Sequence, residues 1–538
     1  MQLFCTQTSD AMFSAGVEEY MSEYGFLCLS WEQAMSIDFD LVIAASLGDN
    51  LHEIKSPILR LAHGNGYNKY SNREPGAGSR EPGAGSREPG AGSREPGAFG
   101  LTEDTLKYGD RVVPSAIGLS HFEQLDRLAE GCPDALPRAF IAGDPCYDRL
   151  IASLPRRLNY RHAFGLHPGQ RLITVNSTWK YDSLFGIDPM LIPRLLEQLP
   201  YDGFRIALIL HPNIWASHSR LQIESWLFDA RRAGLLLIPP NEGWRAAVIA
   251  ADWVVSDHGS VSMYAAALGR PVLLEKSAWS AIDPRSGLGR LFDVAPTLDP
   301  LAPITPQLRL ADDLRAQTHA LAETWVSSAP GHALALIRNA AYRLMGTPAP
   351  TAEPVLLALP DPEIGAAIPS ALWMHVEQTN GGGGPSDLDV RRTPAAVANK
   401  APIPAHGAEG VLIVSDGELD HRLSSMADIV GIARSALPAD EVTWSHSIFE
   451  HRFGVRLTVV HDSGSAKVRS REGRVASIAL ESITHPGDAE LVFAVLAERA
   501  LGDESALEDV AALRQLRLNV SPDRTIAAEF RTTLGPTG

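Results

Sequence analysis

Short apolar runs alternate with stretches of helical periodicity along much of this chain, and the alternation occurs twice. The first series of runs lies at residues 3–5, 26–29, 41–45, 58–62, 116–119 and 139–142, and the second at 172–175, 205–210, 235–238, 253–255 and 272–274. Short apolar runs separated by helices are typical of parallel strands, which are buried on both faces. The sequence therefore predicts an α/β fold with two doubly wound domains, residues 1–166 and 167–345.

The segments between these runs carry apolar residues at helical spacing. We expect helices at residues 13–24, 122–130, 190–198, 221–233, 244–251 and 261–268, and a long pair at 308–325 and 331–344 that can cross back to the first domain. Two Rossmann-like domains with such a crossing form the architecture called GT-B. Its ligand site should lie in the cleft between the domains, at the carboxyl ends of the strands.

A low-complexity insert interrupts the first domain. The unit Arg-Glu-Pro-Gly-Ala-Gly-Ser occurs in three tandem copies from Arg73 and ends in a partial fourth copy at residues 94–98. Its period of seven does not predict a coiled coil, because each unit carries a proline and two glycines and no large apolar residue. We expect residues 72–98 to form a disordered, solvated insert.

The composition shifts toward proline and glycine after residue 345, which predicts a linker over residues 346–409. Apolar runs return at 411–414, 455–460 and 475–480, and residues 490–500 have the pattern of an amphipathic helix. These features predict a small α+β domain of unknown role over residues 410–538. Strands near 354–359 and 372–377 would belong to it.

The charge balance argues against two classes of partner. The chain has 538 residues, with 47 Lys and Arg against 64 Asp and Glu, a net charge of −17. Such a surface repels nucleic-acid backbones and anionic lipid headgroups. We therefore expect no nucleic-acid partner, although a local basic pocket is compatible with this balance.

The cysteines and the hydropathy pattern indicate the compartment. Cys5, Cys28, Cys132 and Cys146 form no Cys-x-x-Cys pair and are typical of reduced thiols. No run of eighteen apolar residues predicts a transmembrane segment, and the N-terminus does not resemble a signal peptide. These patterns favour a cytoplasmic protein.

Two histidine segments follow predicted strands of the two domains. His63-Gly64-Asn65-Gly66, with Lys69 close behind, ends the run at 58–62, and His211-Pro212 ends the run at 205–210. A histidine at the rim of a sheet can transfer protons near neutral pH, and glycines let a ligand approach the backbone. Each segment is also compatible with an ordinary surface loop.

Two further segments lie where a strand leads into a helix. Ser256-Asp257-His258-Gly259-Ser260 opens the helix at 261–268, whose N-terminus could hold a phosphate. Gly143-Asp144-Pro145, followed by Asp148, forms a turn before another helix. N-capping alone would also explain both segments.

The order and spacing of these segments resemble the CDP-glycerol glycerophosphotransferases, the polymerases and primases of teichoic-acid type, which have the GT-B fold. The resemblance spans His63 to Leu274, about two fifths of the chain. It rests on His63-Gly64 with Lys69, Gly143-Asp144-Pro145 with Asp148, Ser177-Thr178-Trp179, His211-Pro212, and Ser256 to Ser260 followed by Gly269-Arg270-Pro271. These are similar to the family's Trp-His-Gly-Thr-Pro-x-Lys, Gly-x-Pro-Arg-x-Asp, Pro-Thr-Trp, His-Pro and Thr-Asp-Tyr-Ser-Ser segments.

This resemblance implies a transferase that moves a polyol-phosphate from a CDP-activated donor to a hydroxyl acceptor in cell-surface polymer synthesis. His63 would be the general base, and His211 would stabilise the pyrophosphate as charge develops on it. Ser256, Asp257, His258, Gly259, Ser260 and Lys69 would bind the nucleotide and its phosphates, with Gly64, Gly143, Pro145, Asp148, Thr178 and Arg270 in support. It implies no metal and no cofactor besides the donor, an acceptor that is a polymer or lipid-linked, and a place in the cytoplasm or at the inner face of the membrane.

The sequence departs from the family pattern at four places: Ala62 replaces Trp, Asn65-Gly66 replaces Thr-Pro, Gly259 replaces the first Ser of the pair, and Tyr264 stands where Asp is usual. Two alternatives therefore stay open. One is a GT-B glycosyltransferase that uses a nucleotide sugar, and the other is a non-catalytic descendant that binds a nucleotide or a partner. A P-loop hydrolase is excluded, because no Gly-Lys-Ser/Thr occurs.

Overall fold

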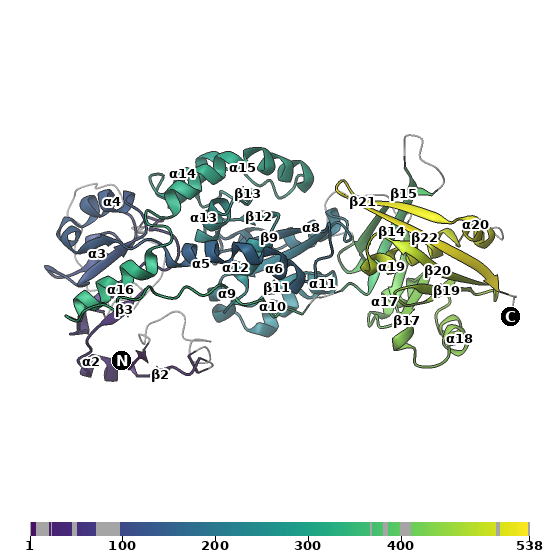
Figure 1. Cartoon of the computed structure of the whole chain (residues 1–538), viewed down its shortest axis with the longest axis horizontal. Helices are drawn as coiled ribbons and strands as arrows, with labels where there is room; N and C mark the ends of the chain where they lie inside the picture. Colours follow the sequence, from purple (N-terminus) through teal and green to yellow (C-terminus); the bar gives the residue numbers. More distant parts are fainter. Residues whose placement is uncertain are drawn as a thin grey trace.

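The computed structural model describes residues 2–6, 21–22, 24–45, 51–70, 97–365, 368–379, 386–398, 410–501 and 506–535. Most of the helix expected at 13–24 and all but the last two residues of the insert at 72–98 lie outside these ranges. The described residues form three bodies in a row along the long axis of the molecule (Figure 1). No described helix combines the length and the hydrophobicity needed to span a membrane.

The first body is a four-stranded parallel sheet in the order β3-β4-β7-β8. Its strands are β3 (Val42–Ala44), β4 (Ile58–Arg60), β7 (Ala116–Leu119) and β8 (Ala139–Ile141). The described helices of this part are α2 (Trp31–Ser36), α3 (Glu103–Leu106) and α4 (Glu123–Gly131), with 3₁₀ turns η1 (Leu51–Glu53) and η2 (Pro133–Arg138). The next helices, α5 (Pro145–Ser153) and α6 (Arg157–Ala163), and the 3₁₀ turn η3 (Leu154–Arg156) between them follow β8, but Leu150 and Tyr160 lie in the core of the second body. The alternating runs thus predicted this sheet correctly.

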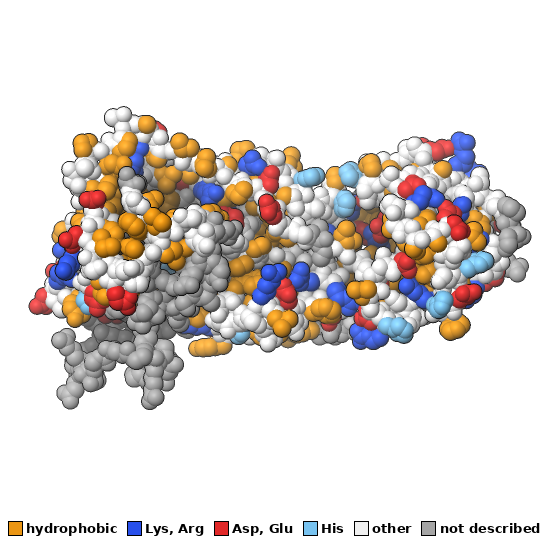
Figure 2. All heavy atoms as spheres, turned by 90° about the horizontal axis from the view of Figure 1, so that it is seen from below, with side chains coloured by type: hydrophobic (Ala, Val, Ile, Leu, Met, Phe, Trp, Pro, Cys, Tyr) orange, Lys and Arg blue, Asp and Glu red, His pale blue; other side chains and the backbone are white. Residues whose placement is uncertain are grey.

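Two predicted strands do not join that sheet. β1 (Phe4–Cys5) and β2 (Leu27–Cys28) pair only with each other, and β5 (Lys107–Tyr108) and β6 (Arg111–Val112) form a small hairpin. Apolar side chains of the first forty-five residues stay exposed, among them Leu3, Phe4, Leu27 and Ile43. Figure 2 shows hydrophobic side chains over the N-terminal end of the molecule, on its left. The β1–β2 sheet therefore contributes little to the core.

The second body is a five-stranded parallel sheet in the order β11-β10-β9-β12-β13. Its strands are β9 (Arg171–Ser177), β10 (Phe204–Leu210), β11 (Leu236–Ile238), β12 (Trp253–Ser256) and β13 (Val272–Leu274). The strand order reverses between β9 and β12. In open α/β sheets, ligands bind beyond the carboxyl ends of the strands at such a reversal.

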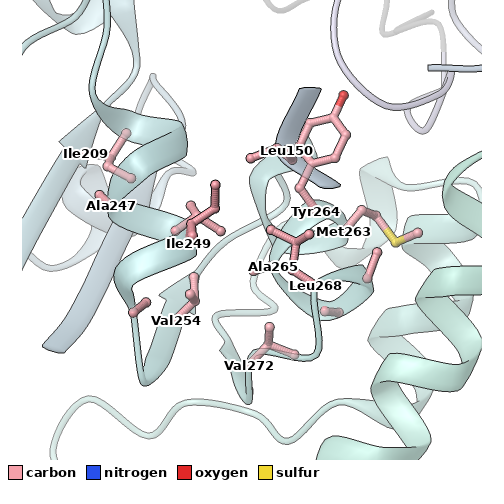
Figure 3. Packing of buried hydrophobic residues seen from close by; sticks show 14 of the residues in the cluster. Leu150, Ile209, Ala247, Ile249, Val254, Met263, Tyr264, Ala265, Leu268 and Val272 are labelled. Atoms are coloured by element: carbon pink, nitrogen blue, oxygen red, sulfur yellow. The ribbon is translucent and has the colours of Figure 1, made fainter. Parts of the chain in front are cut away.

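Helices cover both faces of this sheet. They are α7 (Leu184–Ile187), α8 (Leu191–Gln198), α9 (Pro212–Ser217), α10 (Arg220–Trp226), α11 (Phe228–Arg232), α12 (Trp244–Ala250), α13 (Ser260–Ala267), α14 (Gly287–Val294) and α15 (Ile304–Val326), with 3₁₀ turn η4 (Trp279–Ala281). Figure 3 shows Ala247 and Ile249 of α12 and Met263 and Ala265 of α13 in the core. α13 is buried from Ser262 to Ala267, and only its first two residues are partly exposed.

Of the helix pair at the end of the second domain, α15 packs on α13 and α14 of the second body, and only α16 (Ala333–Leu344) crosses back to the first. α16 packs Ala340 and Ala341 against Leu59 of β4. The run at 354–359 is not a strand, which corrects that prediction. The run is an extended connector that lies alongside α5 and α6. The Tyr160 hydroxyl of α6 donates to the carbonyl of Leu359 in this connector at 2.9 Å. The architecture of two parallel sheets with a helix crossing back is thus present.

The third body is a closed barrel of nine strands, which corrects the expectation of a small α+β domain. The strands are β14 (Ala371–Gln378), β15 (Asp387–Pro394), β16 (Val411–Ser415), β17 (Ile429–Ala433), β18 (Leu457–His461), β19 (Ser465–Ser470), β20 (Val475–Ile483), β21 (Gln515–Ser521) and β22 (Arg524–Gly535). Because β14, β15 and the 3₁₀ turn η5 (Ala395–Val397) lie within 346–409, that range is not only a linker.

One helix fills the inside of this barrel. α19 (Ala489–Arg499) is buried from Leu491 to Ala497 and shares a core with alternate residues of the surrounding strands, such as Val459 and Phe530. A helix that is apolar all round belongs in such an interior. The remaining helices are α17 (His421–Met426), α18 (Glu441–His451) and α20 (Ala506–Ala512), with turns η6 (Arg434–Ala436) and η7 (Pro486–Asp488). α18 packs Trp444 and Phe449 on the outer face of the barrel.

Buried charges join the barrel to the second body. The Arg392 guanidinium donates to both oxygens of Asp202, at 2.8 and 2.6 Å, and both side chains are nearly fully buried. Arg524 pairs with Asp488 and also donates to the carbonyl of Asp202. Val397, just after β15, lies in the core of the second body. The barrel is therefore packed against the second sheet domain.

We expect Arg392→Ala to lower the free energy of unfolding by about 3–5 kcal/mol, because it leaves the Asp202 carboxylate buried without its partner. Replacing both residues with apolar side chains of similar volume should cost much less. Denaturant unfolding of the full chain measures both values. Equal losses in the single and double variants would contradict this role of the pair.

Candidate functional site

The predicted histidine and glycine segments meet at the carboxyl ends of β4, β9, β10 and β12. His63 follows β4, Thr178 follows β9, His211 follows β10, and Asp257 follows β12. The last three lie beside the reversal of strand order in the second sheet. The structure therefore brings the main predicted site residues together in the region between the two sheets.

The His63 side chain is exposed, and its ring orientation is fixed by one hydrogen bond. Nδ1 lies 3.1 Å from the carbonyl oxygen of Ala45. Because a carbonyl can only accept, Nδ1 carries the proton of this bond. In the neutral ring Nε2 is then a lone-pair acceptor, so His63 is arranged as a base.

Gly64 is the point where the two sheet domains touch at the site. Its φ is +83°, and a Cβ placed on it would lie 2.7 Å from Oγ of Ser260. Any larger residue would be strained and would also clash with Ser260. The loop after β4 therefore lies directly against the start of α13.

The rest of this loop pairs with the second domain. Lys69 forms an isolated antiparallel bridge with Ile282, the Tyr70 N–H donates to the Ala281 carbonyl at 3.0 Å, and the Asp283 N–H donates to the Asn68 carbonyl at 2.8 Å. On its other side Tyr70 forms a bridge with Ala98. Lys69 is thus fixed where the two domains meet.

His211 has the opposite arrangement to His63. Its Nδ1 accepts from the backbone N–H of Asn213 at 3.1 Å, so in the neutral ring the proton is on Nε2. Burial, followed by the nearby charges of Lys69 and His63, lowers the pKa of His211 to about 4, against the opposing effect of Asp257. At neutral pH His211 is therefore an uncharged N–H donor.

Asp257 is fully buried and organises the loop after β9. Its Oδ2 accepts from the N–H and the hydroxyl of Thr178, both at 2.8 Å, and from the N–H of Leu184 at 3.0 Å. Its Oδ1 accepts from Gly259 N–H at 3.3 Å. The carboxylate is engaged by protein donors and would repel a phosphate, so its contacts correct the expectation that it binds the ligand directly.

Ser256 and His258 are buried as well and support this loop from behind. The Ser256 hydroxyl accepts from the Asn176 amide at 3.0 Å. His258 Nε2 lies 3.2 Å from the Thr178 hydroxyl, whose proton goes to Asp257, so the imidazole is the donor. Within the predicted segment only Gly259 and Ser260 are partly exposed. These two residues are the ones in a position to meet a ligand.

Lys180 is a site residue that the motif analysis missed. Its backbone is in the left-handed region, with φ 78°, and its carbonyl accepts from the Ser183 hydroxyl at 2.7 Å. Its ammonium lies 4.6 Å from the centre of the Trp179 ring, which in turn stacks on His211. A strained residue held by its surroundings is typical of functional loops. The signal was available, because lysine is rare in this chain.

The two lysines lie close enough to influence each other. Much of the Lys69 side chain is accessible, yet the protein packed around its ammonium lowers its pKa. The charge of Lys180 adds to this lowering, whereas Asp257 and Asp182 oppose it. The ammonium groups of Lys69 and Lys180 and the neutral N–H of His211 together form a local site for an anion, although the whole chain has a net charge of −17.

Gly143, Pro145 and Asp148 support the junction of α5 with the crossing helix rather than the cleft. The Asp148 carboxylate accepts from Gly331 N–H at 2.6 Å and from Ala333 N–H at 2.9 Å, which caps α16. Gly143 has φ +71°, and a Cβ there would lie 2.9 Å from the Ala329 carbonyl. Pro145 begins α5. These contacts hold the first sheet domain and α16 together.

Tyr264, one of the departures from the family pattern, joins this junction. Its hydroxyl donates to Asp144 Oδ2 at 2.9 Å. Burial raises the pKa of Tyr264 well above its ordinary value. The amide of Asn65 donates to the Val326 carbonyl at 2.7 Å and lies 3.4 Å from the same Asp144 oxygen. The changed residues thus form a polar contact between the loop after β4 and α13.

Arg270 does not belong to the site. It directly precedes β13, at the amino ends of the strands, where Arg157 and Arg161 surround Asp252. Burial, followed by the charges of Arg157 and Arg161, lowers the pKa of Arg270 to about 10. Arg270 lies at the opposite edge of the sheet from His211. Among the described residues, no cluster of three or more His, Cys, Asp or Glu is arranged to hold a metal ion.

No protein-family model matches this sequence, and no curated protein matches it either. A comparison with solved structures finds weak matches, among them the following three. The wall teichoic acid polymerase TagF is 13% identical; the match spans 61% of this chain and 84% of the TagF chain, with a TM-score of 0.41. MnaA of S. aureus with UDP is 11% identical; the match spans 61% of this chain and 87% of MnaA, with a TM-score of 0.40. A glycosyltransferase of Rickettsia africae is 8% identical; the match spans 61% of this chain and 88% of that protein, with a TM-score of 0.33. Likeness this low does not decide function, which has to be argued from the site.

The low pKa of His211 predicts a pH-dependent stability. The folded state binds this proton only near pH 4, whereas an unfolded histidine binds it near pH ~6.5, so the unfolded state holds more protons between these values. The contribution of His211, up to about 3 kcal/mol, is present above pH ~6.5 and is lost as the pH falls toward 4. Denaturant unfolding from pH 4 to 7 should show a shallower pH dependence in His211→Gln than in wild type. The exposed His446→Gln is the control and should leave the dependence unchanged, and an unchanged slope in His211→Gln would count against this assignment.

The anchoring role of Asp257 predicts a large cost for its removal. Asp257→Ala leaves the donors of Thr178 and Leu184 buried without an acceptor, and we expect the free energy of unfolding to fall by about 3 kcal/mol or more. Asp257→Asn keeps one acceptor oxygen and should cost less. Chemical unfolding measures both, and an Asp257→Ala protein as stable as wild type would disprove the anchor.

Proposed function

We propose that this chain is a transferase that moves a polyol-phosphate from a CDP-activated donor to a hydroxyl acceptor in the synthesis of a cell-surface polymer. The observation that carries the proposal is the complementary state of the two histidines. His63 presents a lone pair at Nε2, and His211 presents an N–H at Nε2. One base and one neutral donor on opposite domains suit the two ends of a phosphoryl transfer.

The reaction follows from these states. His63 removes the proton of the acceptor hydroxyl, whose oxygen forms a bond to the β-phosphorus of the donor. The bond from this phosphorus to the bridging oxygen breaks, and CMP leaves with the electron pair. His211 donates a hydrogen bond to the phosphate oxygens on which charge accumulates. Such fixed donors are effective because they need no reorganisation during the reaction.

Lys69 and Lys180 supply positive charge for the diphosphate. Burial is the main cause of the lowered pKa of Lys69, and repulsion from Lys180 adds to it; this repulsion is relieved when an anion lies between the two ammonium groups. Asp257 holds the loop that carries Lys180, and Gly64 brings the loop that carries Lys69 against Ser260. Thr178, Gly259 and Ser260 complete the wall of the site on the second domain.

The nucleotide preference tests the donor class. We expect CDP and CMP to raise the melting temperature of the purified chain by several degrees, because a ligand at about 100 times its Kd stabilises by roughly 2.7 kcal/mol. Thermal unfolding with CDP, CMP, UDP and GDP in turn measures this. A preference for UDP would favour a nucleotide-sugar glycosyltransferase. No shift with any nucleotide would contradict a transferase and favour a non-catalytic descendant.

Variants of the site separate the roles. We expect His63→Gln to lose turnover by about 100-fold or more while it keeps nucleotide binding, because only the base is removed. Lys180→Ala should instead weaken nucleotide binding by roughly 10-fold, and Lys55→Ala, an exposed lysine of the first domain, should change neither. Release of CMP and a nucleotide titration are the measurements. A His63→Gln protein with wild-type turnover would overturn the role of His63.

A further inference from the structure

Arg60 on β4 is the largest side chain in the fully buried interior, with 1% of its surface exposed. It lies three residues before His63 on the strand that leads into the site. Its Nη1 donates to the carbonyl of Thr105 at 3.3 Å. Its Nε and Nη2 are buried and have no hydrogen-bond partner.

Tyr67, on the other side of His63 in the sequence, has the same property. It is 7% exposed, and its hydroxyl is buried without a partner. Gly100 lies against both side chains, since a Cβ on Gly100 would be 2.6 Å from the Tyr67 ring and 3.4 Å from Arg60 Nη2. Arg60 and Tyr67 therefore lie next to each other against Gly100, and together they carry three buried donors without acceptors.

The nearby carboxylates are already used. Arg127, whose Nη1 donates to the Tyr67 carbonyl, is paired with both oxygens of Glu123 at 2.7 and 2.8 Å and lies 3.6 Å from Asp283. No carboxylate of the described residues pairs with Arg60. Burial lowers the pKa of Arg60, yet a guanidinium stays charged at neutral pH. A buried charge without a counter-ion costs several kcal/mol.

We propose that a small monovalent anion, of the kind represented by chloride, binds between Arg60 and Tyr67. It would accept from Nε and Nη2 of Arg60 and from the Tyr67 hydroxyl, which satisfies all three donors at once. The one negative charge of such an anion matches the one positive charge of the Arg60 guanidinium. Because Arg60 and Tyr67 flank His63 and Gly64 in the chain, the bound anion would tie the two ends of the loop that carries His63.

A chloride titration of the full chain tests this site. Sodium gluconate replaces sodium chloride at constant ionic strength, so that general screening does not change. We expect the melting temperature to rise by several degrees with chloride and then to saturate. Tyr67→Phe removes one donor and should shift the midpoint of the titration to about 10-fold higher chloride.

Arg60→Met removes the charge with similar volume and should abolish the chloride dependence. Its matched control is Arg194→Met, since Arg194 is also buried but is paired with Asp188, and this variant should keep the dependence. Should Arg60→Met fail to fold, a crystal grown in bromide decides by its anomalous signal beside Arg60. A wild-type stability independent of chloride, or no bromide at Arg60, would overturn the proposal and leave water as the partner. Nucleotide binding is measured separately, so failure of this site leaves the proposed function standing.

Discussion

The buried carboxylate of Asp257 is the constraint on which the site depends. It lies at the end of β12 and binds both ends of the loop that follows β9, so one side chain joins the two central strands at their carboxyl ends. A single buried acceptor with three strong donors leaves that loop few alternatives. The strained backbone of Lys180 and the stacking of Trp179 on His211 both follow from this anchor.

The two sheets were predictable from the sequence because buried parallel strands have a local signature. Runs such as 205–210 and 253–255 need no knowledge of their partners to be recognised. The barrel was not predictable, since its closure depends on the pairing of β14 with β16, and the sequence of either strand gives no sign of it. The burial of α19 inside the barrel was not predicted either: residues 490–500 were expected to form an amphipathic helix with one solvated face, whereas α19 is buried continuously from Leu491 to Ala497.

The site itself was predicted in part. The motifs found His63, Gly64, Lys69, His211 and Ser260, which do come together, but whether they act in catalysis stays a prediction. Motifs did not separate residues that face the cleft from those that hold it, so Asp257 and His258 were assigned to the ligand although both are buried. Lys180 was missed although lysine is rare in this chain, since its left-handed backbone is visible only in the structure. Arg60 was missed because a charged residue within a strand gives no sign of whether it has a partner.

The bridge between Tyr70 and Ala98 has a consequence for the history of this gene. Tyr70 and Ala98, which stand on either side of most of the repeats in the sequence, are paired, and the Phe99 N–H donates to the Lys69 carbonyl at 2.7 Å. The closure entropy of whatever chain joins them grows only slowly with its length, by about 0.6 kcal/mol for each doubling. We therefore expect gain or loss of a seven-residue copy, for example by slippage during DNA replication, to be nearly neutral for folding and to leave the site in place.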